Sequence, residues 1–305
     1  MIEMPDDSKG RALLRGCGTA LVTPFAADGS IDEAALRSFV NWQIDEGIHF
    51  VVPCGSTGEA ATMTPDEHRK VVEITVEEVN GRVPVVAGAG SNDTKKAIAL
   101  SKEMKAAGAT HLLHTSPMYN KPPQRGIVAH FRAIADATDL PVVVYNVPAR
   151  TGSNVEAATT LELAQHENIT AVKEASGNLA QISEIIRGRP DNFTILSGDD
   201  SITLAVLAEG GDGVVSVTSN VVPRLAAQMV ELWDNGDPKG AREIAHRLAP
   251  WTIAAFVESN PIPAKAVLAM MGQIQNVLRL PLVSLKDSYS QIVREALTAT
   301  GAMDA

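Results

Sequence analysis

Eight short apolar segments recur along the chain, and the stretches between most of them have the composition of amphipathic helices. The apolar segments are residues 18–25, 49–55, 83–90, 111–117, 141–148, 169–174, 193–200 and 211–217. Strands that are apolar nearly throughout and are joined by helices predict a parallel sheet with a covered outer face. Eight such units in about 250 residues favour an α/β fold, the closed (β/α)8 TIM barrel.

The strands stop after Asn220, and the rest of the chain reads as four helices separated by Pro and Gly. The first of these helices would close the outer ring of the barrel. We therefore predict an N-terminal segment over 1–17, the barrel over 18–235 and a helical C-terminal extension over 236–305.

Composition restricts the class of partner. The 305 residues are 45% hydrophobic and 20% charged, with a net charge of −10 and no basic run, so we expect no nucleic-acid partner. No apolar run approaches the roughly 20 residues that span a bilayer, and the first ten residues are unlike a signal peptide. We expect a cytoplasmic protein without a membrane partner.

Cysteine and histidine spacing gives no sign of a disulfide or a metal site. Cys17 and Cys54 lie in separate strand-like segments, and we expect two small buried residues. In the segment HLLH, His111 and His114 would point to opposite faces of a strand, so no metal site is predicted there.

Active sites of (β/α)8 barrels lie at the carboxyl ends of the strands, which makes the polar residues at those ends candidates. They are Thr23, Ser56, Thr57, Glu59, Ser91, Asn92, Tyr119, Tyr145, Arg150, Lys173, Ser197 and Asp199. Lys173 is unlike the rest because it ends an apolar strand. Burial lowers the pKa of an ammonium and leaves an amine that can attack a carbonyl, which is Schiff-base chemistry. Alternatively, Lys173 points outward and pairs with a surface carboxylate.

Two further features favour the chemical interpretation. Tyr145 ends the preceding strand, where a phenol could shuttle protons to an imine, although it could also be a core tyrosine. The glycine-bracketed segment CGSTGE offers two hydroxyls and backbone N–H groups that suit a carboxylate, although such loops are often only turns.

Seven segments resemble the serial motifs of one family. They are CGSTGE, SPMYNKPPQRG, YNVPARTG, VKEASG, LSGDD, GVVSVTSN and ESNPIPAK. In this order they are similar to the pyruvate-dependent class I aldolases of the dihydrodipicolinate synthase and N-acetylneuraminate lyase superfamily, over about residues 18–285. The resemblance implies a (β/α)8 barrel with a helical C-terminal extension.

The resemblance also implies roles for individual residues. Lys173 would form the Schiff base with C2 of pyruvate, and Tyr145 would be the general acid/base in a hydroxyl relay with Ser56 and Tyr119. Arg150 occupies the position at which the synthases hold the carboxylate of aspartate semialdehyde. Substrate-binding positions are implied for Thr57, Arg150, Gly198 and Val215. No metal or organic cofactor is implied.

The resemblance also implies a homotetramer, a dimer of dimers in which Tyr119 would reach the neighbour's active site. Lysine-inhibited members carry a His, a Tyr and a Glu where this chain has Pro65, Met118 and Lys96. We therefore expect weak inhibition by lysine, or none.

The resemblance thus favours the condensation of pyruvate with aspartate semialdehyde. Three alternative functions stay open. The first is a lyase or aldolase that uses the same Lys173 with a sugar acid, such as N-acetylneuraminate or a 2-keto-3-deoxy acid; Ser56 favours it and Arg150 disfavours it. The second is a non-catalytic barrel, which the presence of both Lys173 and Tyr145 disfavours. The third is a metal-dependent class II aldolase, which the lack of a His and carboxylate cluster at the strand ends disfavours.

Overall fold

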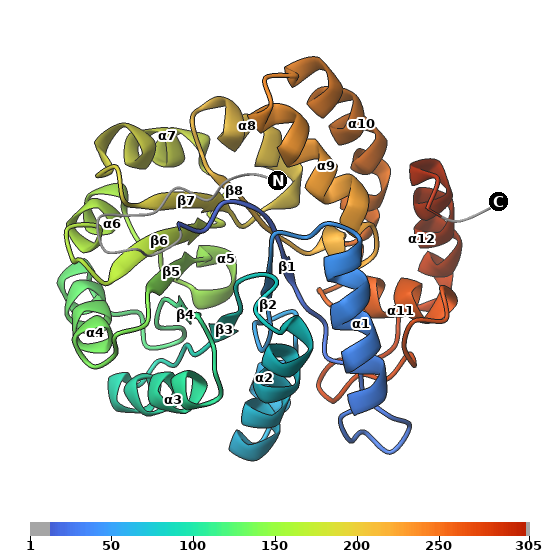
Figure 1. Ribbon diagram of the computed structural model, residues 1–305, viewed down its shortest axis with the longest axis horizontal. Coiled ribbons are helices and arrows are strands. Elements are labelled where there is room, and N and C mark those ends of the chain that lie inside the picture. The colour runs from blue at the N-terminus through green and yellow to red at the C-terminus, as the bar shows by residue number, and fades with distance from the viewer. Residues whose placement is uncertain (1–12, 303–305) are drawn as a thin grey trace. The chain divides into compact units, whose positions relative to one another are not determined.

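The computed structural model describes residues 13–302, which pack into two compact units (Figure 1). The first unit comprises residues 13–16 and 86–215, and the second comprises 17–85 and 216–302. The strands are β1 (Gly16–Ala20), β2 (Phe50–Val52), β3 (Val86–Gly88), β4 (His111–Thr115), β5 (Val142–Asn146), β6 (Ile169–Glu174), β7 (Thr194–Ser197) and β8 (Gly213–Ser216).

The helices of the first unit follow its strands in sequence. They are α3 (Thr94–Ala106), α4 (Gln124–Asp136), α5 (Pro148–Thr151), α6 (Ala157–Leu163), α7 (Leu179–Gly188), η2 (Asp200–Ile202) and α8 (Thr203–Ala208). The helices of the second unit are α1 (Glu33–Asp45), η1 (Ala60–Thr62), α2 (Pro65–Val79), η3 (Thr218–Asn220), α9 (Pro223–Asp234), α10 (Pro238–Ala254), α11 (Ile262–Met270) and α12 (Asp287–Thr300).

Six parallel strands form the sheet of the first unit, in the order β3, β4, β5, β6, β7 and β8. Helices α3, α4, α6 and α7 follow one another along its outer side (Figure 1). The layer between strands and helices is a buried apolar cluster that includes Phe131, Val144, Val172 and Ile195. Because both faces of these strands are covered, apolar side chains at consecutive positions are all buried.

In the second unit β1 and β2 pair in parallel, and Gly18 stands opposite Phe50. Helix α1 packs on α2, while α10 packs on α9 and α12. Trp251 of α10 is fully buried, and its indole N–H donates to the Thr218 carbonyl at 3.2 Å. Trp251 therefore ties α10 to η3.

The start of α2 shows how local sequence sets an element. Thr64 accepts from the backbone N–H of Glu67 at 3.2 Å, and the Glu67 carboxylate accepts from the Thr64 backbone N–H at 2.9 Å. This is a capping box with Pro65 in the first turn, and it satisfies N–H groups that no helical carbonyl reaches.

The predicted fold class is confirmed: each of the eight parallel strands precedes a helix, as in a (β/α)8 TIM barrel, and a helical C-terminal region follows. The domain boundary between residues 235 and 236 stays a prediction. Cys17 and Cys54 are buried free thiols. Within residues 13–302 no helix combines the length and apolar character needed to cross a bilayer.

Candidate active site

Lys173 lies inside the first unit, at the carboxyl end of β6. It stands in register with Tyr145 of β5 on one side and Leu196 of β7 on the other. The residue is 5% exposed, and its Nζ lies 4.2 Å from the centroid of the Tyr145 ring. The alternative that Lys173 points outward to a surface carboxylate is therefore wrong.

Burial is the main influence on the Lys173 amine. It lowers the pKa of Lys173 from 10.5 to about 7; the Asp200 carboxylate opposes this shift, and the Arg150 guanidinium adds to it. A substantial fraction of the amine is therefore unprotonated near neutral pH and can act as a nucleophile.

Tyr145 presents the complementary group. Its side chain is 7% exposed, and burial raises the pKa of the phenol to about 12, an effect that the charge of Arg150 partly offsets. The phenol therefore keeps its proton at neutral pH. A protonated phenol beside an unprotonated amine is a donor and acceptor arrangement suited to proton transfer.

Gly198 leaves the space that the lysine side chain occupies. A Cβ at this position would lie 3.1 Å from both Cγ and Cε of Lys173 and 2.7 Å from Cβ of Ala175. A larger residue would therefore crowd Ala175 and the carbon chain of Lys173. Val215 is buried on β8.

Arg150 and Tyr119 lie in the loops of the same unit. Arg150 is an exposed residue of α5, and its charge acts on both Lys173 and Tyr145. The side chain of Tyr119 is 89% exposed, and its backbone has a φ of 73°, a left-handed conformation that is uncommon for a residue with a side chain. Its N–H donates to the Thr151 carbonyl at 3.2 Å, which ties the Tyr119 loop to the Arg150 loop.

Ser56 and Thr57 belong to the second unit, in the turn that follows β2. Thr57 is buried, and its hydroxyl accepts from Nδ2 of Asn260 at 2.8 Å, whereas Ser56 is exposed. The Thr23 hydroxyl donates to the Gly58 carbonyl at 2.8 Å. Side chains from distant segments therefore hold this turn in place.

A buried ion cluster in the second unit was not predicted from the sequence. Lys265 of α11 is fully buried; its Nζ lies 2.7 Å from Oε1 of Glu59 and donates to the Thr23 carbonyl at 2.9 Å. The other Glu59 oxygen accepts from the Arg279 backbone N–H at 3.0 Å. Nζ of Lys265 also lies 4.3 Å from the Phe25 ring centroid. A lysine within the apolar residues of α11 was the available signal, because such a residue requires a partner.

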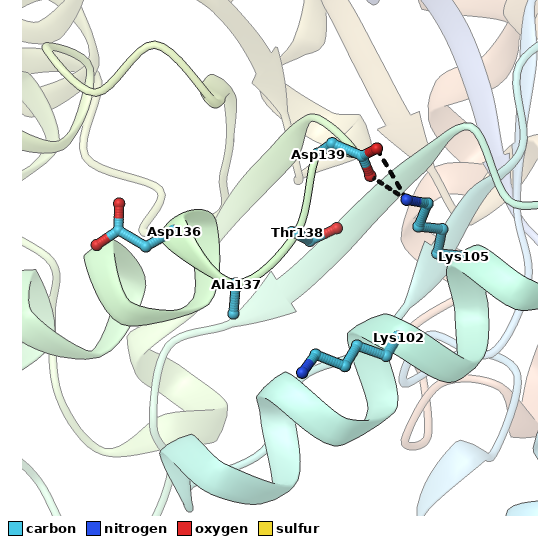
Figure 2. A pocket seen from close by; sticks show the side chains of 6 residues that line it. All are labelled: Lys102, Lys105, Asp136, Ala137, Thr138 and Asp139. Carbon is cyan, nitrogen blue, oxygen red and sulfur yellow. Dashed lines mark hydrogen bonds and ion pairs between the residues drawn. The ribbon is translucent and has the colours of Figure 1, made fainter.

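A depression of about 440 Å³ lies elsewhere on the first unit, between the ends of α3 and α4 (Figure 2). Its lining residues are Lys102, Lys105, Asp136, Ala137, Thr138 and Asp139. Lys105 binds Asp139 across it at 2.7 Å (Figure 2). These residues precede β4 and β5, so the depression is at the amino ends of the strands. It is therefore separate from Lys173 and Tyr145.

The low pKa of Lys173 predicts how stability changes with pH. In the unfolded chain this ammonium has its ordinary pKa near 10.5, so between about pH 7 and 10.5 the unfolded state binds one more proton than the folded state. Stability from this group therefore rises with pH across that window, and the full burial penalty applies below it. We expect Lys173→Met to stabilise the fold at pH 7 by on the order of a few kcal/mol and the gain to disappear near pH 10.5. Urea unfolding across this pH range measures the difference.

Lys265→Met is the matched control, because it removes a second buried ammonium that does have a partner. It strands the Glu59 carboxylate, so we expect destabilisation by about 3–5 kcal/mol. If Lys173→Met and Lys265→Met changed the free energy of unfolding equally, the inferred difference between Lys173 beside Tyr145 and Lys265 paired with Glu59 would be wrong.

Comparison with known proteins identifies the family. The dihydrodipicolinate synthetase family profile matches residues 13–300. The 4-hydroxy-tetrahydrodipicolinate synthase of Koribacter versatilis is 54% identical over 274 residues, which cover 90% of this chain and 91% of that protein. The dihydrodipicolinate synthase structure from Thermotoga maritima has a TM-score of 0.94 at 40% identity and covers 95% of this chain and 100% of that one. The chloride-inhibited dihydrodipicolinate synthase from Acinetobacter baumannii, solved in complex with pyruvate, has a TM-score of 0.93 at 37% identity over 95% and 99% of the two chains. The chain belongs to the dihydrodipicolinate synthetase family.

Proposed function

We propose that this protein is a lyase, a 4-hydroxy-tetrahydrodipicolinate synthase. It condenses pyruvate with L-aspartate 4-semialdehyde in lysine biosynthesis through diaminopimelate. The observation that carries the proposal is the buried Lys173 amine beside Tyr145, in a chain 54% identical to a protein of that name.

The reaction begins when Nζ of Lys173 adds to C2 of pyruvate and the carbinolamine loses water to form an imine. Loss of a methyl proton gives an enamine, whose carbon adds to the aldehyde of the semialdehyde. The amino group of the condensed product then displaces Lys173 from the imine carbon, which closes the ring and regenerates the free amine. Tyr145 passes protons to and from the reacting oxygen and nitrogen atoms.

The two substrate carboxylates define the remaining roles. Arg150, an exposed guanidinium on α5, binds the carboxylate of the semialdehyde. Thr57 and the backbone N–H groups of its turn bind the carboxylate of pyruvate, while Gly198 and Val215 shape the space around the imine. Ser56 and Tyr119 complete the hydroxyl relay. A cationic Arg150 favours an anionic aldehyde over the polyhydroxylated aldehyde of a sugar-acid lyase.

The assembly that we propose is a homotetramer in the cytoplasm, built as a dimer of dimers. The 89% exposed side chain of Tyr119 supports this arrangement, because a relay tyrosine that faces away from its own chain could serve a neighbouring copy.

Pyruvate with borohydride tests the Schiff base directly. We expect reduction to add one pyruvate-derived group at Lys173, found by mass spectrometry of a digest, and labelling should rise with pH through about 7 as the amine loses its proton. The adduct should be absent from Lys173→Ala. Lys265 is an internal control, because its ammonium is buried against Glu59. Labelling of Lys265 in place of Lys173, or labelling of the Lys173→Ala variant, would refute the role of Lys173.

Tyr145 and Arg150 should respond differently to substitution. Tyr145→Phe keeps the ring beside Lys173 and removes the proton, so kcat should fall by roughly 10²–10⁴. Arg150→Ala should raise KM for aspartate semialdehyde much more than KM for pyruvate, since it removes a contact to one substrate. Initial rates with each substrate varied separately distinguish these outcomes. An unchanged kcat in the first variant, or equal KM effects in the second, would remove the residue from its proposed role.

Weak inhibition by lysine follows from Lys96. This residue is exposed near the start of α3, at the position where inhibited relatives are expected to place a carboxylate for the ligand's ammonium. Two like charges at about 4–6 Å repel, so lysine at several millimolar should leave the initial rate nearly unchanged. Lys96→Glu should increase the sensitivity to lysine. Strong inhibition of the unaltered enzyme would show that binding does not require an acid there.

A further inference from the structure

Glu174 is a fully buried carboxylate that directly follows Lys173 in the sequence. Successive residues of a strand point to opposite faces, so the carboxylate lies on the outer side of β6 while the amine lies beside Tyr145. Within residues 13–302 its oxygens accept hydrogen bonds only from neutral amide groups. Oε2 accepts from Nδ2 of Asn146 at 2.9 Å and Nε2 of Gln181 at 3.1 Å, and Oε1 accepts from the Ser176 N–H at 2.7 Å.

A buried carboxylate without a cationic partner is costly, and it persists only where hydrogen bonds replace its water. Its donors come from three elements: the end of β5, the loop after β6 and the first turn of α7. Structural packing alone would be served equally well by an apolar residue at this position. Packing therefore does not explain why a carboxylate at this position is bound by donors from three elements.

The first reason concerns the two reacting side chains. Asn146 directly follows Tyr145 just as Glu174 directly follows Lys173, and both pairs are in register across β5 and β6. The bond between Asn146 and Glu174 thus joins the outer faces of the strands one residue beyond the phenol and the amine. It restricts how far the ends of β5 and β6 can slide along each other or move apart. The 4.2 Å contact between Nζ of Lys173 and the Tyr145 ring depends on that geometry.

The second reason concerns the loop that carries Arg150. Oδ1 of Asn146 accepts from the Val155 N–H at 2.9 Å, and Nδ2 of Asn146 donates to Oδ1 of Asn154 at 2.8 Å. Nδ2 of Asn154 in turn donates to Oε1 of Gln181 at 2.7 Å. The segment that returns from α5 is therefore bound to the same network.

We propose that Glu174, acting through Asn146 and Gln181, is a positioning residue that holds Lys173, Tyr145 and the Arg150 loop in one geometry for imine chemistry. This inference rests on the proposed Schiff-base function of Lys173. Glu174 lies on the face of β6 opposite Lys173, so its contribution belongs to the proton-transfer steps and not to pyruvate binding.

Three variants and one control test this proposal. Glu174→Gln replaces one of the two acceptor oxygens with an NH2 donor, so at least one of the three amide donors around it loses its acceptor. Asn146→Asp combined with Glu174→Gln reverses the polarity of both partners and restores a donor and an acceptor between the strands. Gln181→Met removes one donor from a half-buried position and is the milder change. Asn168→Asp is the control: Asn168 is buried at the amino end of β6 and donates to the carbonyls of residues 135, 138 and 140, far from the strand end that holds Lys173.

We expect Glu174→Gln to lower kcat by about 10–100-fold, with KM for pyruvate changed by less than about threefold, because a small misplacement of reacting groups costs rate more than binding. The double variant should recover kcat severalfold relative to Glu174→Gln. Gln181→Met should lower kcat by about 2–10-fold. Asn168→Asp should lower Tm and leave kcat per folded enzyme unchanged.

The proposal is overturned if Glu174→Gln and Gln181→Met lower Tm but have the same kcat per folded enzyme as the Asn168→Asp control. Should Glu174→Gln not fold, kcat of Gln181→Met alone decides between the two outcomes. Borohydride labelling of the unaltered enzyme with pyruvate distinguishes a failure of the positioning proposal from a failure of the proposed function. A wild type that is unlabelled at Lys173 refutes the Schiff base itself, whereas a labelled wild type with unaffected variants refutes only the positioning role.

Discussion

The cost of removing one ammonium from water governs the candidate site. Lys173 occupies an apolar strand whose neighbours leave it 5% exposed, and its Nζ lies 4.2 Å from the centroid of the Tyr145 ring. An ammonium there loses hydration, and burial outweighs the opposing charge of Asp200, which shifts the equilibrium toward the neutral amine. The fold thus produces a nucleophile near neutral pH by excluding water.

The contrast with Lys265 shows that burial alone is insufficient. Both lysines are buried, and burial lowers the pKa of Lys265 as well, but there the Glu59 carboxylate at 2.7 Å opposes the shift, and the Thr23 carbonyl at 2.9 Å accepts from the ammonium. That ammonium is a structural cation that joins α11 to the turn after β2. The carboxylate partner of Lys265 therefore opposes the burial penalty that acts on both lysines.

The sequence predicted the features that depend on local pattern. Eight apolar runs located all eight strands. Lys173 and Tyr145 were expected to meet because residues at the ends of adjacent parallel strands are neighbours. The partners of buried charges could not be found in this way. Lys265 and Glu59 are 206 positions apart, and only the packed fold brings them together.

Strand geometry also explains how a carboxylate can follow the lysine in sequence without neutralising its function. If Glu174 shared a face with Lys173, it would pair with the ammonium and raise the pKa that burial lowers. The twofold alternation of a strand instead places the acid among the amides of Asn146, Gln181 and Ser176. The Glu174 carboxyl ties β5 to β6 on the outer face, away from the Lys173 amine. A single residue step along β6 thus separates the proposed nucleophile from the residue that we propose to position it.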